Sequence, residues 1–278
     1  MLKADNLTFS YSRKTPPVLN SLSLSVEPGG IYGLLGLNGV GKTTLLNLMA
    51  GLLTPKSGNV TLNGTNTRKR LPETLGDIFF VPEEFALPSM TVREYARLTG
   101  KFYPRYSSED MNRCLDTFGL RDCDMIADLS MGQRKKALLS FAIACNTSLL
   151  LLDEPTNGLD LPGKKALKGL LASSVDETRS VVLSTHQIAD IQNIIDHLIV
   201  MRNGKILFNV PLSTIGERFC FELTNSPAVI ADALYRQPIF SGNIVILPND
   251  DGRDTEIDLE TFFYFSTEQP ETVCRLLS

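Results

Sequence analysis

The chain of 278 residues contains no tryptophan, only two histidines, and no pair of cysteines at the CxxC spacing of metal and redox sites. Its five cysteines are odd in number and widely spaced, at positions 114, 123, 145, 220 and 274. This pattern argues against a disulfide framework and against a cysteine zinc site. We therefore expect reduced thiols, as in proteins of the cytosol.

The sequence also lacks a run long enough to span a bilayer. The longest uncharged segment, residues 137–152, has 16 residues and is interrupted by polar side chains, whereas a transmembrane helix needs about 20 mainly apolar residues. We expect this segment to be a buried helix followed by a buried strand. Lys3 and Asp5 stand where the apolar core of a signal peptide would begin, so we expect the chain to start as mature protein.

The overall composition shows no bias toward disorder. Hydrophobic residues make up 43% and charged residues 21% of the chain, as in soluble globular proteins. Residues 1–215 carry 23 basic and 20 acidic side chains, whereas residues 216–278 carry 4 and 11. Because binding of nucleic acid or anionic lipid draws on clustered Lys and Arg, this acidic final segment disfavours either as its partner. The length favours one main domain with a modest appendage.

The strongest motif is GLNGVGKT at residues 36–43, which matches the phosphate-binding pattern GxxxxGK[ST]. Glycines allow successive backbone N–H groups to surround a phosphate, and the following helix directs its free N–H groups at the same anion. We expect Lys42 to reach the β and γ phosphates and Thr43 to bind magnesium. A chance glycine turn is disfavoured because the strand and helix patterns are both in place. The other predicted nucleotide contacts are Gly36, Asn38, Gly39, Gly41 and Thr44.

A second predicted site follows four consecutive leucines, residues 149–152. Such a run is typical of a central parallel strand buried on both faces, and ligands bind at the carboxyl ends of these strands. We expect Asp153 to hold magnesium through water, and Glu154 to orient the attacking water or accept its proton. The alternative is that the two carboxylates only cap the next turn, which the phosphate loop upstream makes less favoured.

The segment VVLSTH, residues 181–186, repeats this arrangement with a strand that ends in polar residues. The imidazole of His186 is expected to hydrogen-bond the γ-phosphate or the attacking water. His197 opens another predicted strand, and we interpret it as structural.

Together with the segment DLSMGQRKKALLSFAIA, residues 128–144, these motifs resemble the ATP-binding cassette (ABC) ATPases. Residues 129–133 are similar to that family's LSGGQ signature, which other phosphate-loop classes lack, and the resemblance covers about residues 2–215. It implies ATP and Mg²⁺ as cofactors, ATP hydrolysis, and a head-to-tail homodimer with two ATPs between two subunits. The signature precedes a helical pattern and so predicts a second anion-binding helix N-terminus, which would serve the other chain's nucleotide. The residues implied there are Ser130, Gly132 and Gln133, while Met131 replaces the family's first glycine.

Three further roles are implied by the resemblance. Tyr11 matches the aromatic residue that stacks on adenine, and Asp160 matches the residue that couples the two sites of the dimer. Glu83, in FFVPEEFALP at residues 79–88, stands where the family has its Q-loop glutamine. Two roles stay open for Glu83: it is a magnesium ligand, or it moves out to meet a basic group on a partner, with Glu84 as a solvated neighbour.

The predicted fold class is α/β, a P-loop NTPase core with a mostly parallel sheet, an antiparallel β edge, a helical subdomain at about residues 89–140 and a small carboxyl-terminal β-rich appendage. Residues 1–30 alternate apolar and polar as antiparallel strands do. We expect an ABC ATPase domain at residues 1–215 and an accessory segment at residues 216–278. Three runs in that segment have strand-like composition: FCFEL, NIVILPN and TEIDLETFFYF.

An ATPase without a membrane span implies a separate integral membrane permease subunit, and a location at the cytoplasmic face of the cell membrane. The single cassette and residues 98–120 look most like the ATPase subunits of bacterial ABC-2 type exporters. Two alternatives stay open. One is a soluble ABC ATPase that acts in assembly or repair, and the other is a weakly hydrolysing nucleotide-dependent switch, suggested by Glu83 and Met131.

Overall fold

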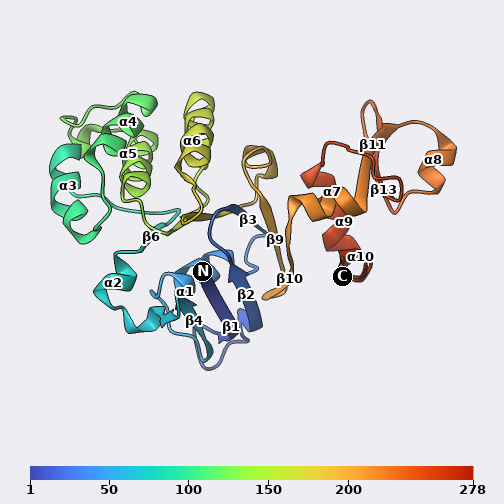
Figure 1. Cartoon of the computed structure of the whole chain (residues 1–278), viewed down its shortest axis with the longest axis horizontal. Coiled ribbons are helices and arrows are strands. Elements are labelled where there is room, and N and C mark those ends of the chain that lie inside the picture. Colours follow the sequence, from blue (N-terminus) through green and yellow to red (C-terminus); the bar gives the residue numbers. More distant parts are fainter. Residues whose placement is uncertain (278) are drawn as a thin grey trace.

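A six-stranded sheet forms the centre of the molecule, with strand order β10-β9-β3-β8-β7-β6. Figure 1 shows this sheet in the computed structural model, which describes residues 1–277. All neighbouring strands run parallel except the edge strand β10, which pairs antiparallel with β9. The carboxyl ends of the parallel strands therefore meet at one edge, as predicted. The strands are β3 (Ile31–Leu35), β6 (Ile78–Val81), β7 (Leu149–Asp153), β8 (Ser180–Thr185), β9 (His197–Arg202) and β10 (Lys205–Pro211).

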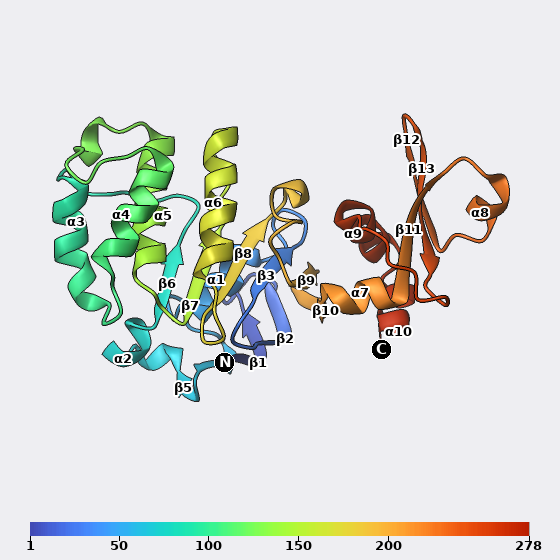
Figure 2. The ribbon, with the colours of Figure 1, turned by 45° about the horizontal axis from the view of Figure 1, so that its top comes forward.

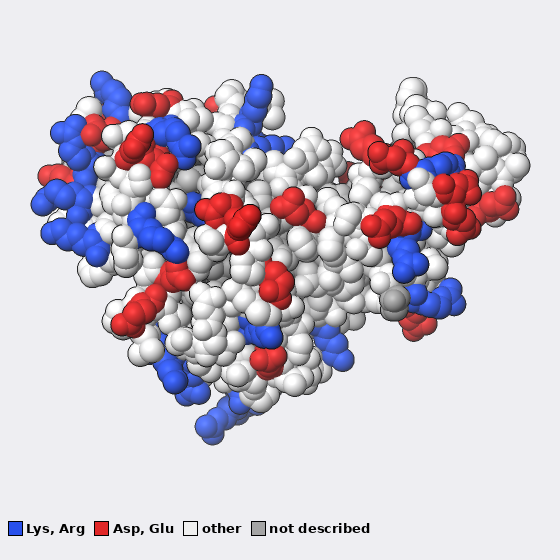
Figure 3. Space-filling view, in the orientation of Figure 1, with Lys and Arg blue, Asp and Glu red and all other residues white. Residues whose placement is uncertain are grey.

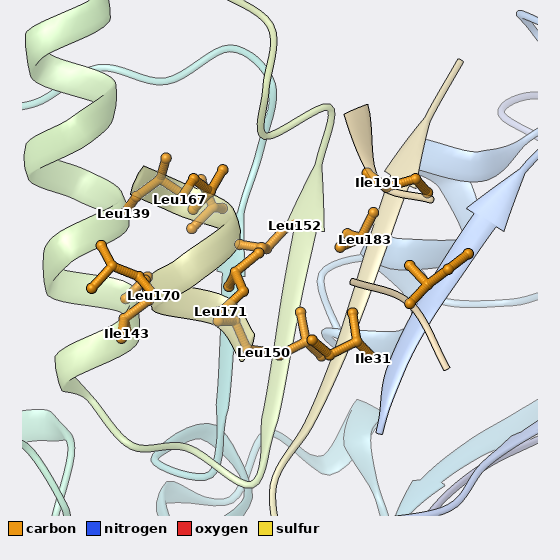
Figure 4. Close-up of a cluster of buried hydrophobic side chains, with 14 of the residues drawn as sticks. Ile31, Leu139, Ile143, Leu150, Leu152, Leu167, Leu170, Leu171, Leu183 and Ile191 are labelled. Carbon is orange, nitrogen blue, oxygen red and sulfur yellow. The ribbon is translucent and has the colours of Figure 1, made fainter. Parts of the chain in front are cut away.

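Strand β7 is buried on both faces, which confirms the prediction from its leucines. Leu150 and Leu152 pack on one face with residues of α5 (Met131–Ala144) and α6 (Leu161–Ser174), as Figure 4 shows. Leu149 and Leu151 belong to the cluster on the opposite face, together with residues of α1 (Lys42–Met49). Each fully buried leucine contributes roughly 1.5–3 kcal/mol, so this strand is a rigid support for the polar residues at its end.

An antiparallel sheet of order β2-β1-β4-β5 lies against the α1 side of the core, as the alternation in residues 1–30 predicted. It is tied to β10 by the Asn209 amide, which donates a 2.8 Å hydrogen bond to the Ser25 carbonyl. The strands are β1 (Leu2–Phe9), β2 (Leu19–Val26), β4 (Ser57–Leu62) and β5 (Thr65–Asn66), and the short helix α2 (Pro72–Leu75) follows them.

Helices α3 (Val92–Thr99) and α4 (Ser108–Phe118) form a lobe with α5 beside the central sheet (Figure 2). The side chain of Thr91 caps α3 by accepting from the Glu94 N–H, and Glu94 returns a bond to the Thr91 N–H. This reciprocal pairing fixes the helix start. Pro104 lies between the two helices. Short 3₁₀ turns occupy residues 67–69, 100–102, 126–128 and 188–190.

The carboxyl-terminal part contains a three-stranded sheet of order β11-β13-β12, flanked by short helices. Two of its three predicted strands are confirmed, but the strand predicted at residues 255–265 is wrong. Helix α9 covers most of that segment because the Asp258 carboxylate caps it by accepting from the Thr261 N–H, and because buried residues recur with helical spacing. The elements are α7 (Leu212–Arg218), β11 (Phe219–Thr224), α8 (Pro227–Ala231), β12 (Tyr235–Ile239), β13 (Gly242–Pro248), α9 (Leu259–Glu268) and α10 (Pro270–Leu277).

This appendage packs on the core through aromatic side chains. The Phe262 ring on α9 lies with its centroid 5.9 Å from that of Phe208 on β10 and 5.3 Å from that of Phe219. Acidic side chains gather on the appendage, whereas Lys and Arg are frequent over the helical lobe (Figure 3). In the described part of the chain, no helix combines the length and the apolar character needed to cross a membrane.

Candidate active site

A cleft of about 440 Å³ lies at the carboxyl ends of the parallel strands and contains most of the predicted site residues. Its lining comes from the loops after β3, β6, β7 and β8 and from the segment before β2. Val18 was not predicted, since an isolated apolar residue beside a strand carries no local functional signal. The lining residues are Tyr11, Val18, Asn38, Gly39, Gly41, Lys42, Thr43, Thr44, Glu83, Asp153, Glu154 and His186.

The loop after β3 has a backbone that requires glycine at two positions. Gly41 has φ +109°, and a Cβ there would lie 2.7 Å from Leu19 Cδ2. At Gly36 a Cβ would lie 2.8 Å from Val40 Cγ1 and 2.9 Å from the Met201 carbonyl oxygen. Both sites exclude any larger residue, so the loop is held close to the chain beneath it. Helix α1 begins directly afterwards and directs its amino end at the cleft, which suits an anion.

Lys42 is buried and spans the loop. Its Nζ atom donates a 2.7 Å hydrogen bond to the Gly36 carbonyl. Burial lowers the pKa of Lys42, while the nearby carboxylates of Glu154, Asp153 and Glu83 act in the opposite direction. The Nζ atom of Lys42 therefore lies between the backbone of the loop and the acidic side chains of the cleft.

The oxygens predicted to bind magnesium lie together. The Thr43 hydroxyl donates to Asp153 Oδ2 at 2.7 Å, and Ser184 Oγ donates to Asp153 Oδ1 at 2.5 Å. Asp153 is 1% exposed, so these two bonds fix its carboxylate. Mg²⁺ prefers hydroxyl and carboxylate oxygens and usually takes only one or two carboxylates beside phosphate oxygens. The donor set fits that ion, and Ser184, which the sequence analysis missed, is the residue that orients Asp153.

Glu154 and His186 meet at the ends of β7 and β8. His186 Nδ1 lies 2.9 Å from Glu154 Oε1, whereas the buried Oε2 has no hydrogen-bond partner within residues 1–277. A buried acceptor without a partner is costly, and a water molecule is the natural group to satisfy it. The pair therefore suits the predicted task of orienting a water and accepting its proton.

Glu83 and Glu84 are both exposed after the end of β6, and only Glu83 lines the cleft. Glu83 Oε1 accepts a 2.9 Å hydrogen bond from Asn157 Nδ2. The structure thus brings Glu83 to the same cleft as the two carboxylates of β7. Its predicted role as a magnesium ligand, and the alternative of a contact with a partner, both stay predictions.

Tyr11 presents a largely exposed ring at the edge of the cleft. The residue is 65% exposed, its ring packs edge-to-face on Phe9 with centroids 5.0 Å apart, and its hydroxyl lies 2.9 Å from Thr44 Oγ1. An exposed aromatic face fixed at a cleft margin suits stacking on a base.

Five predicted residues lie outside the lining of this cleft: Gly36, Ser130, Gly132, Gln133 and Asp160. The Ser130 hydroxyl accepts from the Gln133 N–H at 3.3 Å and starts α5, while Asp160 starts α6 and pairs with Lys136 at 2.7 Å. Gly36 lines a neighbouring cleft beside α9. Within one chain the signature residues therefore do not join the phosphate loop.

Comparison with known proteins gives a consistent result. The family model described as ABC transporter matches residues 19–157. The bacitracin transport ATP-binding protein BcrA of Bacillus licheniformis is 30% identical over 224 residues, which cover 78% of this chain and 72% of that protein. The high-affinity zinc uptake system ATP-binding protein ZnuC of Bacillus subtilis (strain 168) is 33% identical over 220 residues, with 74% and 92% covered. A solved structure described as a dimeric bacterial ABC transporter cassette matches with TM-score 0.68 and 26% identity, covering 76% of this chain and 99% of that one.

Proposed function

Because this chain belongs to the ATP-binding subunits of ABC transporters, we propose that it hydrolyses ATP with Mg²⁺ and thereby powers export of a substrate through a separate integral membrane permease. The observation that carries this proposal is the convergence of five side chains in one cleft. The phosphate loop and the end of β7 each supply two of them, and His186 follows β8. The five are Lys42, Thr43, Asp153, Glu154 and His186.

Each residue has one task in the proposed reaction. Lys42 and the loop N–H groups bind the β and γ phosphates, and Thr43 with Asp153 would hold Mg²⁺, which supplies charge neutralisation on the phosphate oxygens. Glu154 Oε1 is held by His186, and Glu154 Oε2 accepts the proton of the water whose oxygen bonds to the γ-phosphorus. The bond between that phosphorus and the bridging oxygen breaks, and ADP and inorganic phosphate leave.

The proposed working unit is a head-to-tail homodimer. Ser130, Gly132 and Gln133 start α5 away from the cleft of their own chain, so a phosphate contact by these residues requires a second chain. Asp160 would couple the two sites from its place at the start of α6. The likeness to a dimeric cassette structure supports this arrangement.

Export and location are the finer parts of the proposal. The relative named for bacitracin transport and the resemblance of residues 98–120 to ABC-2 type exporter subunits support export, whereas the zinc uptake relative shows that similar sequences also serve uptake. We place the protein at the cytoplasmic face of the membrane, with residues 1–215 as the ATPase domain and residues 216–278 as an accessory segment. Nucleic acid is not proposed as a partner because the accessory segment is acidic.

Purification from detergent-solubilised native membranes tests the transport role. We expect a tagged chain to bring an integral membrane protein with it, and the complex to hydrolyse ATP in the presence of Mg²⁺. A chain recovered wholly in a soluble complex without a membrane protein would contradict the permease proposal and favour an assembly or repair role. Substrate movement into inverted vesicles that contain the complex would decide for export.

The dimer is tested separately in solution. Glu154→Gln keeps the shape of the side chain and should accumulate the ATP-bound form, so light scattering should show a doubled mass with ATP and a monomer without it. Adding Ser130→Glu places a negative charge at the signature and should abolish the doubling. A mass that changes neither with ATP nor with this second substitution would contradict the head-to-tail arrangement.

A further inference from the structure

Lys135, on α5, is buried in a position that the proposed mechanism does not use. It is 4% exposed, although lysine is among the residues that are least often fully buried. Its Nζ atom donates hydrogen bonds to two backbone carbonyl oxygens, that of Glu154 at 2.7 Å and that of Asn157 at 2.9 Å. A cation has thus been placed under the turn that carries the proposed hydrolytic carboxylate.

This turn has a backbone that needs support. Glu154 has φ +46°, a left-handed conformation that costs a non-glycine residue of order 1–3 kcal/mol and persists only where the surroundings impose it. The Asn157 N–H closes the turn on the Glu154 carbonyl at 3.2 Å, and the Glu154 N–H donates to the Ser184 carbonyl at 3.1 Å. Lys135 stabilises the turn further, because its Nζ atom donates hydrogen bonds to the carbonyls at both ends of the turn.

Lys135 also connects the turn to Glu83. Asn157 accepts from Lys135 with its carbonyl and donates from its side-chain amide to Glu83 Oε1 at 2.9 Å. Burial lowers the pKa of Lys135, and the carboxylates of Glu83, Glu154 and Asp153 oppose that effect in that order. The ammonium group therefore lies within electrostatic reach of all three carboxylates of the site.

We propose that Lys135 is a positioning residue for hydrolysis: its ammonium group fixes the Glu154–Asn157 turn, and with it the direction of the Glu154 carboxylate and the place of Glu83. This inference rests on the proposed function of Glu154 in ATP hydrolysis. It assigns no contact with nucleotide to Lys135, which is not among the residues that line the cleft.

Lys135→Met is the first test, because it removes the charge and the donors but keeps most of the stem. We expect kcat to fall by about tenfold or more while the Kd for ATP stays within about twofold, since loss of an interaction that acts only on the reacting step lowers kcat alone. Lys135→Arg keeps charge and donors and should restore part of kcat. The matched control is Lys165→Met on the exposed face of α6, which should leave both constants unchanged.

A double variant tests the connection to Glu83. Lys135→Met removes a positive charge that lies within electrostatic reach of the Glu83 carboxylate, so adding Glu83→Gln should relieve part of the defect. We expect the loss in kcat of the double variant to be at least about threefold smaller than the product of the two single losses, the signature of coupled residues. Multiplicative losses would overturn the proposed connection.

The remaining outcomes separate this inference from the proposed function. A wild-type chain that does not hydrolyse ATP contradicts the proposed function itself. If the wild type hydrolyses ATP and folded Lys135→Met retains kcat within about twofold, only the role of Lys135 is overturned. Equal loss of ATP binding and kcat in the Met and Arg variants would mean a purely structural lysine and would also overturn it. If Lys135→Met fails to fold, kcat and the Kd for ATP are measured for the neutral variant Lys135→Gln instead.

Discussion

The Nδ1 atom of His186 lies 2.9 Å from Oε1 of Glu154, across the ends of two neighbouring parallel strands. The contact occupies one carboxylate oxygen and leaves the other, which is buried, without a partner among the described residues. This asymmetry supports the proposal that the two oxygens have different tasks. In that proposal, one orients the side chain and the other binds a water molecule.

Removal of this contact should affect the reaction more than binding. We expect His186→Ala to lower kcat by about a hundredfold, within the range for a residue that assists proton transfer, with a Kd for ATP near the wild-type value. Phosphate release and nucleotide titration measure the two effects. The other histidine provides the control, because His197→Phe on the opposite end of the sheet should retain activity. Equal losses in both variants would contradict a specific role for His186.

The exposed ring of Tyr11 should contribute to nucleotide affinity without a part in hydrolysis. Stacking of a base on an aromatic side chain is worth about 1–3 kcal/mol, so Tyr11→Ala should weaken ATP and ADP binding by about five- to a hundredfold. Tyr11→Phe keeps the ring and loses only the contact with Thr44, so it should bind nearly as tightly. Equilibrium titration with both nucleotides measures this, and an unaltered Kd in the alanine variant would remove Tyr11 from the site.

The magnesium dependence of hydrolysis distinguishes the two proposed roles of Glu83. If the carboxylate is a ligand, Glu83→Gln should raise the Mg²⁺ concentration for half-maximal hydrolysis by about tenfold, because the neutral amide is a weaker ligand for this ion. Glu84→Gln, an exposed neighbour, is the control and should have no effect. An unchanged magnesium requirement in Glu83→Gln would discard the ligand role and leave the contact with a partner.

His197 should make the stability of the fold depend on pH. Its ring stacks on Tyr32 with centroids 4.4 Å apart, and its buried Nδ1 has no hydrogen-bond partner in the described part of the chain. Burial lowers the pKa of His197 from its ordinary value of 6.5, against the opposing effect of Asp196. The unfolded chain therefore binds the proton more readily than the folded chain. The contribution of the neutral His197 ring to the free energy of unfolding is thus complete above pH 6.5 and is lost as the pH falls through and below that value.

Urea unfolding of the wild type and of His197→Phe between pH 8 and pH 5 checks the sign. The free energy of unfolding of the wild type should fall more steeply with acid than that of the variant, which keeps the stacking but has no proton to bind. Parallel curves would show that His197 does not titrate differently in the folded state.

Where the signal is local, the sequence predicted which residues the structure brings together in the cleft. The phosphate loop is contiguous, and the acidic and histidine residues each follow an apolar strand, so a parallel sheet necessarily brings Glu154 and His186 to the same edge. The burial of Lys135 was not predictable in this way, because a lysine on a helix is usually solvated and its partners come from a distant turn. Ser184 was missed because its partner Asp153 lies on another strand, and Val18 because an isolated apolar residue carries no local functional signal.

The carboxyl-terminal helix α9 shows a second limit. Its aromatic residues favour a strand by propensity, yet the segment is helical because Asp258 caps it and Phe262 packs on Phe208 and Phe219. The helical spacing of its buried residues was present in the sequence. Long-range packing with β10 and β11 stabilises the helix over the strand.

The central claim is that Glu154 accepts the proton in ATP hydrolysis. Its most direct test is the steady-state release of phosphate by purified wild type and Glu154→Gln, at saturating ATP and Mg²⁺, with ATP binding measured on the same samples. Glutamine preserves the shape and removes the acceptor for the proton, so we predict a loss of at least about a hundredfold in kcat with ATP binding retained. Hydrolysis by Glu154→Gln at the wild-type rate would contradict the account.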